Sequence, residues 1–425
     1  MTVFAGYPPA VPDPILNLNA LFAADSNPKK VNLGVGAYRD ETGKPWILPS
    51  VREAEKVISA DLTTFNKEYP PMAGFPKFLE AAQRLMFGAD SPVLQQGRVA
   101  SCQAISGSGS LYIGFQLIHH WLKSADVYLP APTWPNHYSL FNNVFGDSGR
   151  KYKEYPYLRA GSLEIDLEGA LQVITKAPRG SVFLFHACAH NPSGIDYTVA
   201  QWDKIRDAIK AHGHVVFFDS AYQGFATGSF EDDARAVRDF VAAGVDVLVA
   251  QSFSKNFGLY GERVGCIHVV HGGAGSEAEN KQLSAALTSG LASLVRATWS
   301  LSAIHGAYIV QTIVHDPHLL KMFYADVATM SGRIRTMRQR LHAALSERRV
   351  PGPGPSGGWD HLVSAIGMFT YTGLAPEHVD YLREKWSIYM VKSGGRMSMC
   401  GLTDANIDYV AEAIADAIAK FPLKK

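Results

Sequence analysis

Apolar residues recur along the middle of the chain in two alternating patterns. Short, nearly continuous apolar runs occupy residues 125–129, 182–185, 215–218 and 245–250, and stretches with helical spacing, such as 75–87 and 201–211, lie around them. Strands that are apolar on both sides and separated by helices indicate a mostly parallel sheet covered on both faces. The pattern predicts a large α/β domain.

The two chain ends have a different pattern. Four prolines within residues 1–14 exclude a regular helix there and favour an extended arm, a shape suited to contacting a partner subunit. A helix is expected at 15–24 and a short strand at 31–35, and a long helix is expected at 319–345. The Pro/Gly cluster at 350–358 then breaks regular structure, and a last helix covers 404–420. We therefore expect a large domain at 49–325 and a smaller α/β domain formed by 15–48 and 326–425.

Composition narrows the class of protein. Apolar residues make up 47% of the chain and charged residues 19%, and the net charge is +1, so nothing indicates nucleic acid or a membrane surface as a partner. The chain has no apolar run of 18 residues and no secretory signal, and its start would be a poor transit peptide. Four irregularly spaced cysteines predict reduced thiols and no zinc site or other metal. We expect a soluble, cytoplasmic protein.

Polar residues that directly follow apolar runs are the first candidates for chemistry, because ligands of open α/β sheets bind at the carboxyl ends of strands. Asp219 ends the run 215–218, and a buried carboxylate needs a partner, for example a protonated pyridine nitrogen. A helix cap or a structural salt bridge is the alternative. Lys255 follows the run 245–250 among small and apolar residues, where a lysine can act as an amine nucleophile. By itself it also fits a solvated loop lysine.

Two further groups of residues are typical of anion binding. Residues 106–110, Ser-Gly-Ser-Gly-Ser, precede an apolar helical stretch, and backbone N–H groups at such a helix start attract phosphate. Ser252 and Arg263 lie near Lys255 in sequence, and hydroxyls with a guanidinium also suit a phosphate. Arg296 and Arg396 are candidates for carboxylates, although most arginines are surface residues. An aldehyde-binding amine, a ring-nitrogen carboxylate and a phosphate site together indicate pyridoxal phosphate.

Five segments carry a resemblance to a known family. They are 31–39 (Val-Asn-Leu-Gly-Val-Gly-Ala-Tyr-Arg), 132–137 (Pro-Thr-Trp-Pro-Asn-His), 186–194 (His-Ala-Cys-Ala-His-Asn-Pro-Ser-Gly), 218–225 (Phe-Asp-Ser-Ala-Tyr-Gln-Gly-Phe) and 251–260 (Gln-Ser-Phe-Ser-Lys-Asn-Phe-Gly-Leu-Tyr). With these segments the chain resembles class I aminotransferases of the aspartate aminotransferase group over nearly its whole length. The resemblance implies the fold type I architecture, whose large domain contains a mostly parallel sheet of the seven-stranded type.

The resemblance also implies how the cofactor, pyridoxal 5'-phosphate, would be held. Lys255 would bind it covalently and move a proton, while Asp219 would pair with the pyridine nitrogen. Tyr222 and Asn191 would hydrogen-bond its phenolic oxygen, and Trp134 would stack on its ring. The phosphate would be bound by Ser106, Gly107, Ser108, Ser252 and Arg263, with Tyr69 from the neighbouring subunit.

The same resemblance implies the substrate contacts. Arg396 would bind the substrate α-carboxylate, together with Gly36 and Asn191, and Trp134 would lie against the substrate. Arg296 of the neighbouring subunit would bind the distal carboxylate of aspartate or glutamate. Sites shared in this way imply a homodimer. The implied reaction is reversible transfer of the amino group from aspartate to 2-oxoglutarate in two half-reactions.

The chain departs from the family pattern in three places. The family's Ser-Asn-Pro-Pro after the distal arginine is Ser-Leu-Ser-Ala at 300–303, which predicts a wider range of amino donors, aromatic ones included. Ser108 replaces a threonine and keeps the hydroxyl. An additional glycine precedes Arg396. A lyase reaction on the same cofactor, such as β-decarboxylation or β-elimination, and a binding protein without catalysis are the competing hypotheses.

Overall fold

The computed structural model describes residues 2–9, 14–273, 275–354 and 356–423, and these form two compact units. The larger unit comprises residues 45–336 and 364–369, and the smaller one comprises residues up to 44, 337–363 and those from 370 onward. The predicted arm lies partly outside the described residues, and the domain boundaries predicted from the sequence stay predictions.

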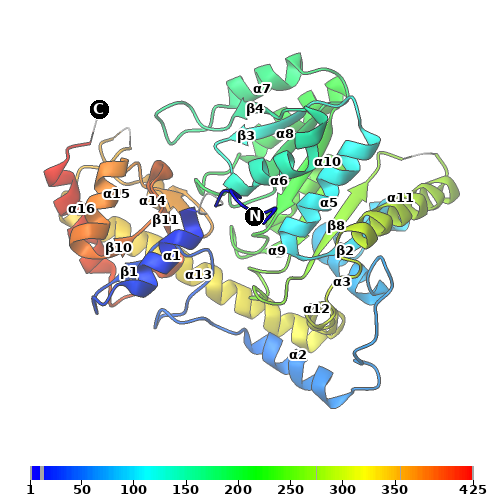
Figure 1. Ribbon diagram of the computed structural model, residues 1–425, viewed down its shortest axis with the longest axis horizontal. Helices are drawn as coiled ribbons and strands as arrows, with labels where there is room; N and C mark the ends of the chain where they lie inside the picture. The colour runs from blue at the N-terminus through cyan, green and yellow to red at the C-terminus, as the bar shows by residue number, and fades with distance from the viewer. Residues whose placement is uncertain (1, 10–13, 274, 355, 424–425) are drawn as a thin grey trace. The chain divides into compact units, whose positions relative to one another are not determined.

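A seven-stranded sheet forms the centre of the larger unit (Figure 1). In spatial order its strands are β2 (Val99–Ala104), β8 (Gly265–Val270), β7 (Val247–Ser252), β6 (Val215–Ser220), β5 (Val182–His186), β3 (Val127–Ala131) and β4 (Lys153–Pro156). β8 runs antiparallel to both of its neighbours, and the pairs from β7 to β4 are parallel. The predicted α/β fold with a mostly parallel sheet is confirmed.

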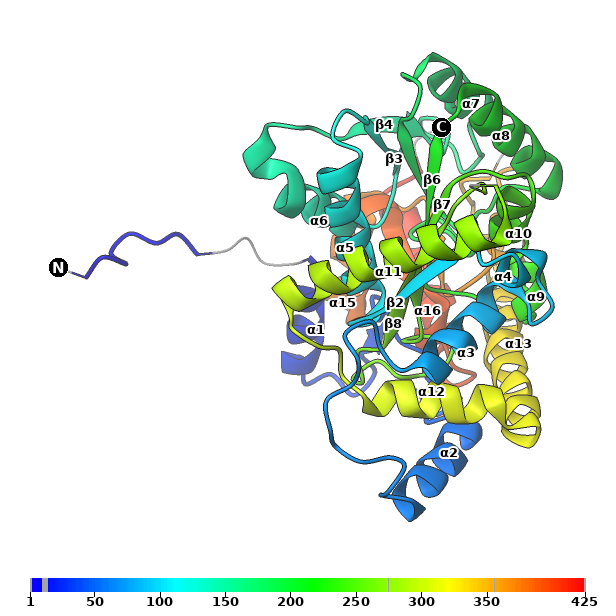
Figure 2. The same ribbon diagram turned by 90° about the vertical axis from the view of Figure 1, so that its right-hand side faces the viewer.

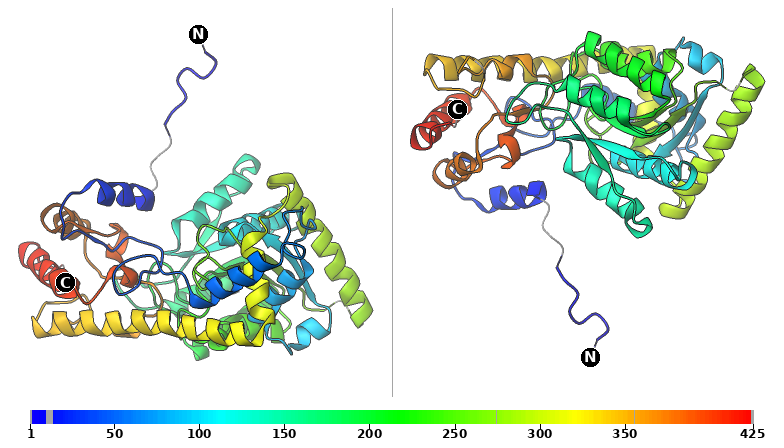
Figure 3. Two further views of the ribbon diagram at one scale, coloured as in Figure 1. Left: turned by 90° about the horizontal axis from the view of Figure 1, so that it is seen from below. Right: turned by 90° about the horizontal axis from the view of Figure 1, so that it is seen from above.

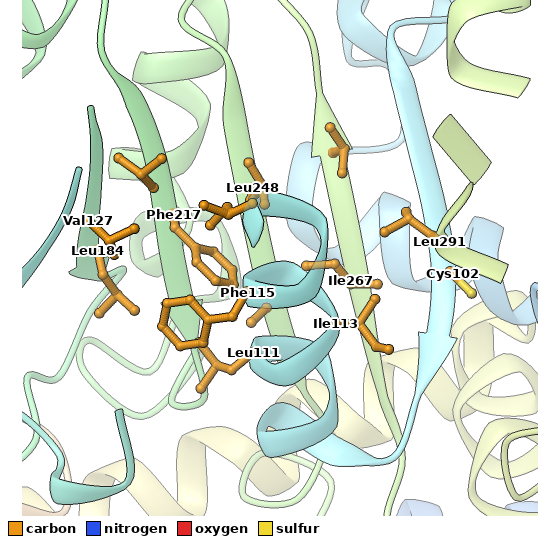
Figure 4. Close-up of a cluster of buried hydrophobic side chains, with 14 of the residues drawn as sticks. Cys102, Leu111, Ile113, Phe115, Val127, Leu184, Phe217, Leu248, Ile267 and Leu291 are labelled. Atoms are coloured by element: carbon orange, nitrogen blue, oxygen red, sulfur yellow. The ribbon is translucent and has the colours of Figure 1, made fainter. Parts of the chain in front are cut away.

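The apolar runs form central strands because side chains on both faces are covered. On β6, Phe217 packs against Phe115 of α5 (Ser106–Trp121) with ring centroids 5.4 Å apart, and the next residue, Phe218, packs against Phe240 of α10 (Arg235–Ala242) at the same distance. Consecutive strand residues point to opposite faces, so both faces of the sheet are buried under helices. On the α5 side, the core extends along the sheet from Val127 to Cys102 (Figure 4).

Helices of the larger unit lie on both sides of the sheet, as the views in Figures 2 and 3 show. They are α2 (Pro49–Ala60), α3 (Pro76–Phe87), α4 (Pro92–Gln95), α5 (Ser106–Trp121), α6 (Pro135–Phe145), α7 (Leu167–Lys176), α8 (Val199–His212), α9 (Phe230–Asp233), α10 (Arg235–Ala242), α11 (Glu277–Thr298) and α12 (His305–His315), with the 3-10 turn η1 (Gly146–Ser148). The 31-residue helix α13 (Pro317–Glu347) continues from the larger unit into the smaller one.

The smaller unit is built from both ends of the chain. Its elements are α1 (Pro14–Ala24), β1 (Val31–Asn32), α15 (Pro376–Trp386), β10 (Ile388–Tyr389), η2 (Ser393–Gly395), β11 (Arg396–Ser398), η3 (Met399–Gly401) and α16 (Ile407–Lys420); α14 (His361–Ser364) and β9 (Phe369–Tyr371) lie at its boundaries. β1 pairs with β10 in parallel, so the first strand of the chain is joined to its last 40 residues.

The strand predicted at 31–35 is shorter than expected. β1 ends at Asn32, whose side-chain Oδ1 accepts a hydrogen bond from the N–H of Gly34 at 3.0 Å. A short polar side chain that takes up a nearby backbone N–H competes with strand pairing. The backbone therefore leaves the ladder just before Gly36.

All four cysteines are buried, and none of them forms a disulfide. Within the described ranges, each helix is too short or too polar to cross a membrane.

Candidate active site

Asp219 lies at the carboxyl end of β6, where parallel strands place their last residues side by side. It pairs in register with His186 of β5 and Ala250 of β7 and is 7% exposed. Its Oδ2 lies 3.0 Å from Nε2 of His137, a fully buried residue of α6. Burial alone would raise the pKa of Asp219, but the hydrogen bond and charge interactions with His137, with contributions from His186 and Lys255, lower it on balance. The carboxylate therefore stays ionised inside the protein.

A hydrogen-bonded chain extends from His137 away from Asp219. The hydroxyl of Thr133 lies 2.8 Å from Nδ1 of His137 and 2.9 Å from Nε2 of His186. Burial lowers the pKa of His186 to about 3, so this imidazole is neutral. Sequence reasoning missed these three positions, although two of the quoted family segments contain them, because their partnership depends on how α6 packs across the strand ends.

Lys255 lies in the loop that follows β7, where it is partly buried. Burial lowers the pKa of its amine; nearby Asp219 opposes this shift and Arg263 adds to it. Its Nζ lies 5.6 Å from the ring centroid of Tyr222, which is 6% exposed and packs edge-on against Phe369. A lysine with a lowered pKa has a larger share of neutral, nucleophilic amine at neutral pH.

The predicted phosphate-binding residues of one chain come together at the start of α5. The hydroxyl of Ser106, the first residue of α5, lies 2.8 Å from that of Ser254 and 3.5 Å from that of Ser252. A Cβ added to Gly107 would lie 3.0 Å from the Cβ of Ser252, so glycine permits this close approach. Ser106 itself has a left-handed backbone, φ +68°. Hydroxyls that converge at the N-terminus of a 16-residue helix are a donor set suited to phosphate.

Two more residues were predicted to bind the phosphate, Ser108 and Arg263. Ser108 is half-buried in the first turn of α5. Arg263 is exposed, has φ +53°, and donates through Nη1 to the carbonyl of Tyr260 at 2.9 Å. Its charge is close enough to affect the pKa of Lys255, so a cation, an amine and the serine hydroxyls share one region.

Trp134 and Asn191 lie on two other loops at the carboxyl ends of strands. Trp134 immediately precedes α6, and its ring lies edge-on to that of His137 with centroids 5.4 Å apart. Asn191 is 6% exposed and directly follows Ala189 and His190, whose backbone is held by Asp196. The Asp196 carboxylate accepts the N–H groups of Ala189 at 2.6 Å and of His190 at 2.8 Å.

Tyr69 and Arg296 are both exposed on the larger unit. Tyr69, in the loop between α2 and α3, is 81% exposed. Arg296, in the last turn of α11, donates through Nη1 to the hydroxyl of Ser300. These are the two residues expected to serve the site of a neighbouring subunit, and their exposure leaves them available to a second chain.

Arg396 is buried within the smaller unit, at the start of β11. It is 4% exposed, and its Nη2 donates to the carbonyl of Gly34 at 3.1 Å, two residues before Gly36. The additional glycine belongs to the turn η2, where Gly394 and Gly395 have φ of +61° and +56°. A Cβ on Gly395 would lie 2.4 Å from the hydroxyl oxygen of Thr372, so this turn requires glycine. The departure from the family pattern is thus a local turn that leads directly into Arg396.

Known proteins resemble the chain over nearly its whole length. The family "Aminotransferase class I and II" matches residues 28–414. The cytoplasmic aspartate aminotransferase of Gallus gallus is 43% identical, with 99% of each chain covered. The mitochondrial aspartate aminotransferase P2 of Lupinus angustifolius is also 43% identical, over 97% of this chain and 87% of that protein.

Solved structures match over the full length. The cytoplasmic aspartate aminotransferase of Giardia lamblia superimposes with a TM-score of 0.98, at 65% identity and 100% coverage of both chains. An aromatic-amino-acid aminotransferase of Burkholderia pseudomallei, covalently bound to pyridoxal phosphate, superimposes with a TM-score of 0.90 at 38% identity, again with 100% coverage of both chains. The chain therefore belongs to the class I and II aminotransferases, within their aspartate aminotransferase group.

Proposed function

We propose that the protein is a pyridoxal-phosphate-dependent aspartate aminotransferase, which transfers the amino group of L-aspartate reversibly to 2-oxoglutarate. One observation carries the proposal: a lysine with a lowered pKa and a buried, ionised aspartate lie at the ends of adjacent parallel strands. Family membership supports the same activity.

The residues at these strand ends fit the cofactor. When bound, pyridoxal phosphate supplies an electron-withdrawing ring that stabilises negative charge at the substrate Cα. Asp219 keeps the ring nitrogen protonated, because its own pKa is held low by His137. Trp134 would lie against the ring, and Asn191 and Tyr222 would hydrogen-bond its phenolic oxygen. The phosphate is bound by Ser106, Gly107, Ser108, Ser252 and Arg263.

Lys255 has two roles in this proposal. Its neutral amine would hold the cofactor, and the same amine, when free, would accept and return the proton of the substrate Cα. A general base works best when its pKa is near the working pH, and burial moves the pKa of Lys255 in that direction.

Substrate recognition uses arginines from different parts of the chain. Arg396, with Gly36, would bind the α-carboxylate, because a guanidinium offers two parallel N–H groups to a carboxylate. We propose that Arg296 and Tyr69 act in the site of a second copy, so that the working form is a homodimer. Their exposure supports this assignment.

The experiment is to mix the holoenzyme with aspartate and follow both the absorbance of the bound cofactor and the formation of oxaloacetate. We expect the absorbance to change, and glutamate to appear when 2-oxoglutarate is added. An unchanged spectrum would reject the proposal. Alanine or ammonia as the product from aspartate would instead indicate the β-decarboxylase or β-elimination alternative.

A second candidate function is transamination of aromatic amino acids. It is favoured by Leu301, an apolar residue in the turn after Arg296, and the aromatic-amino-acid aminotransferase of Burkholderia pseudomallei shares the fold at 38% identity. We propose aspartate as the leading donor and aromatic amino acids as measurable ones. A cytoplasmic location is proposed from the names of relatives, and cell fractionation would test it against the mitochondrial location that another relative's name carries.

A further inference from the structure

Gln103 is a buried residue of β2 that contacts the turn after α11 through both its side chain and its backbone. It is 1% exposed. Its side-chain Nε2 donates to the carbonyl of Ala303 at 2.7 Å, and its own carbonyl accepts a hydrogen bond from the hydroxyl of Ser302 at 3.1 Å. One residue therefore holds two consecutive positions of this turn.

The same turn also holds the side chain of Arg296, through the hydroxyl of Ser300. The hydroxyl of Ser302 accepts a hydrogen bond from Nε1 of Trp299 at 3.1 Å, and the carbonyl of Trp299 accepts one from the N–H of Leu301 at 2.9 Å. Ser300, which accepts the hydrogen bond of Arg296, has φ +71°. A non-glycine residue keeps this backbone conformation only when its surroundings hold it there. The contacts of Ser302 with Gln103 and Trp299 provide that restraint.

Gln103 also contacts the loop that carries Tyr69. Its N–H donates to the carbonyl of Ala73 at 2.8 Å. The next residue, Gly74, has φ +101°, and a Cβ added there would lie 2.5 Å from the Cβ of Gln103. The loop backbone therefore rests directly on the Gln103 side chain, and Tyr69 lies a few residues before this point.

We propose that Gln103 is a positioning residue that fixes the two segments carrying Arg296 and Tyr69 relative to β2, and thereby presents both side chains to the neighbouring subunit's site. The inference rests on the proposed function, which assigns those two residues to a shared site. Exposed side chains have few contacts of their own to fix them, so their position depends on the backbone that carries them. Errors of about 1 Å in a binding group are costly.

The test uses Gln103→Met, which keeps the length of the side chain and its backbone hydrogen bonds but removes the donor to Ala303. We expect the dissociation constant of succinate, measured from the absorbance of the holoenzyme, to rise about tenfold, since a displacement of about 1 Å in a binding group can cost that much or more. The kcat/KM for aspartate should fall by a similar factor through KM, while that for phenylalanine, which has no distal carboxylate, stays within about twofold.

The control is Gln83→Met, the same change at another glutamine that bonds β2, through the hydroxyl of Ser101 at 2.8 Å. It should leave succinate binding unchanged. Ser302→Ala removes the hydrogen bond from the Ser302 hydroxyl to the carbonyl of Gln103. This variant repeats the test if Gln103→Met does not fold. Gly74→Ala forces the loop away from Gln103 and should weaken cofactor binding to the apoenzyme, as Tyr69→Phe should.

The variant Arg296→Ala distinguishes a failure of the inference about Gln103 from a failure of the proposed function. If it weakens succinate binding while Gln103→Met and Ser302→Ala do not, the inference about Gln103 is wrong and the proposed function stands. If Arg296→Ala itself has no effect, the assignment of Arg296 fails and the inference fails with it. Weakened succinate binding in Arg296→Ala and Gln103→Met, with Gln83→Met unchanged, supports the inference.

Discussion

Nε2 of His137 lies 3.0 Å from Oδ2 of Asp219, and both side chains are buried. An ionised carboxylate only accepts hydrogen bonds, so Nε2 of His137 carries the hydrogen. The Thr133 hydroxyl lies 2.8 Å from Nδ1 of His137 and 2.9 Å from Nε2 of the neutral His186, so it links the two imidazoles. Hydrogen-bonded side chains buried in series polarise one another, so Thr133 and His186 support the contact between His137 and Asp219.

Replacing His137 by phenylalanine tests this relationship. The ring is kept and the hydrogen bond to Asp219 is lost, so the pKa of Asp219 should rise. The acid side of the pH profile of kcat/KM should move upward by about one unit. His120→Phe, at an exposed position of α5, is the control for the substitution. An acid limb unchanged in His137→Phe would show that His137 does not control the charge of Asp219.

Removing the charge of Asp219 should have a larger effect. Asp219→Asn keeps the shape of the side chain but cannot hold a proton on the ring nitrogen by charge, so kcat should fall at least about a hundredfold. Asp126→Asn, which removes a partly exposed carboxylate paired with Lys153, should leave kcat as it is. Aspartate turnover by Asp219→Asn at the rate of the unmodified protein would contradict the role given to Asp219.

His268 should make stability depend on pH. Its Nδ1 lies 2.7 Å from the Ser101 hydroxyl and its Nε2 lies 2.9 Å from Oε1 of Gln251, and burial lowers its pKa to about 3. Between the unfolded value near 6.5 and about 3, the unfolded chain binds the extra proton. The free energy of unfolding therefore falls as the pH falls through this window, by at most about 1.4 kcal/mol per pH unit for this residue.

His268→Gln removes this titrating group. The free energy of unfolding should therefore depend less steeply on pH in the variant, by at most about 1.4 kcal/mol per pH unit, which is the contribution of one proton. Urea unfolding at several pH values between about 6 and 4.5 would measure it, with His120→Gln as the control for loss of an imidazole. If His268→Gln and the unmodified protein lose stability in parallel, the buried neutral state of His268 is not the cause.

Two helical glycines should respond in opposite ways to alanine. A Cβ on Gly114 in α5 would lie 2.2 Å from Cζ of Phe217, so Gly114→Ala overpacks the core and should cost about 1–3 kcal/mol. Gly332 in α13 has open space at the same position, and Gly332→Ala should stabilise by about 0.5–1 kcal/mol. Calorimetric melting of both variants checks the prediction, and equal shifts in Tm would contradict it.

The range of amino donors should depend on Leu301. We expect kcat/KM to be highest for aspartate, with tyrosine and phenylalanine measurable, in a panel that also includes alanine. Leu301→Asn restores the residue usual in the family and should increase the preference for aspartate over phenylalanine. A preference that does not change in Leu301→Asn would assign the donor range to other residues.

Local pattern was enough to predict the main elements and to single out two of the residues proposed to act in the reaction. The apolar runs at 182–185 and 215–218 became β5 and β6, because strands buried on both faces need apolar residues at every position. Asp219 and Lys255 could be found because each follows such a run in an open α/β sheet. Likewise, glycines and serines at 106–110 indicated an anion site before any contact was known.

Only the tertiary structure decided which side chains meet. The chain His186–Thr133–His137–Asp219 joins residues from β5, the β3–α6 connection, α6 and β6, and Gln103 joins two segments that are far apart in sequence. Hydrogen-bond partners of this kind are set by how helices and strands pack, which hydrophobic periodicity does not encode. The sequence by itself determined the sheet, the lysine and the carboxylate. Packing determined that the carboxylate is kept ionised and that the segments bearing Tyr69 and Arg296 share one buried anchor.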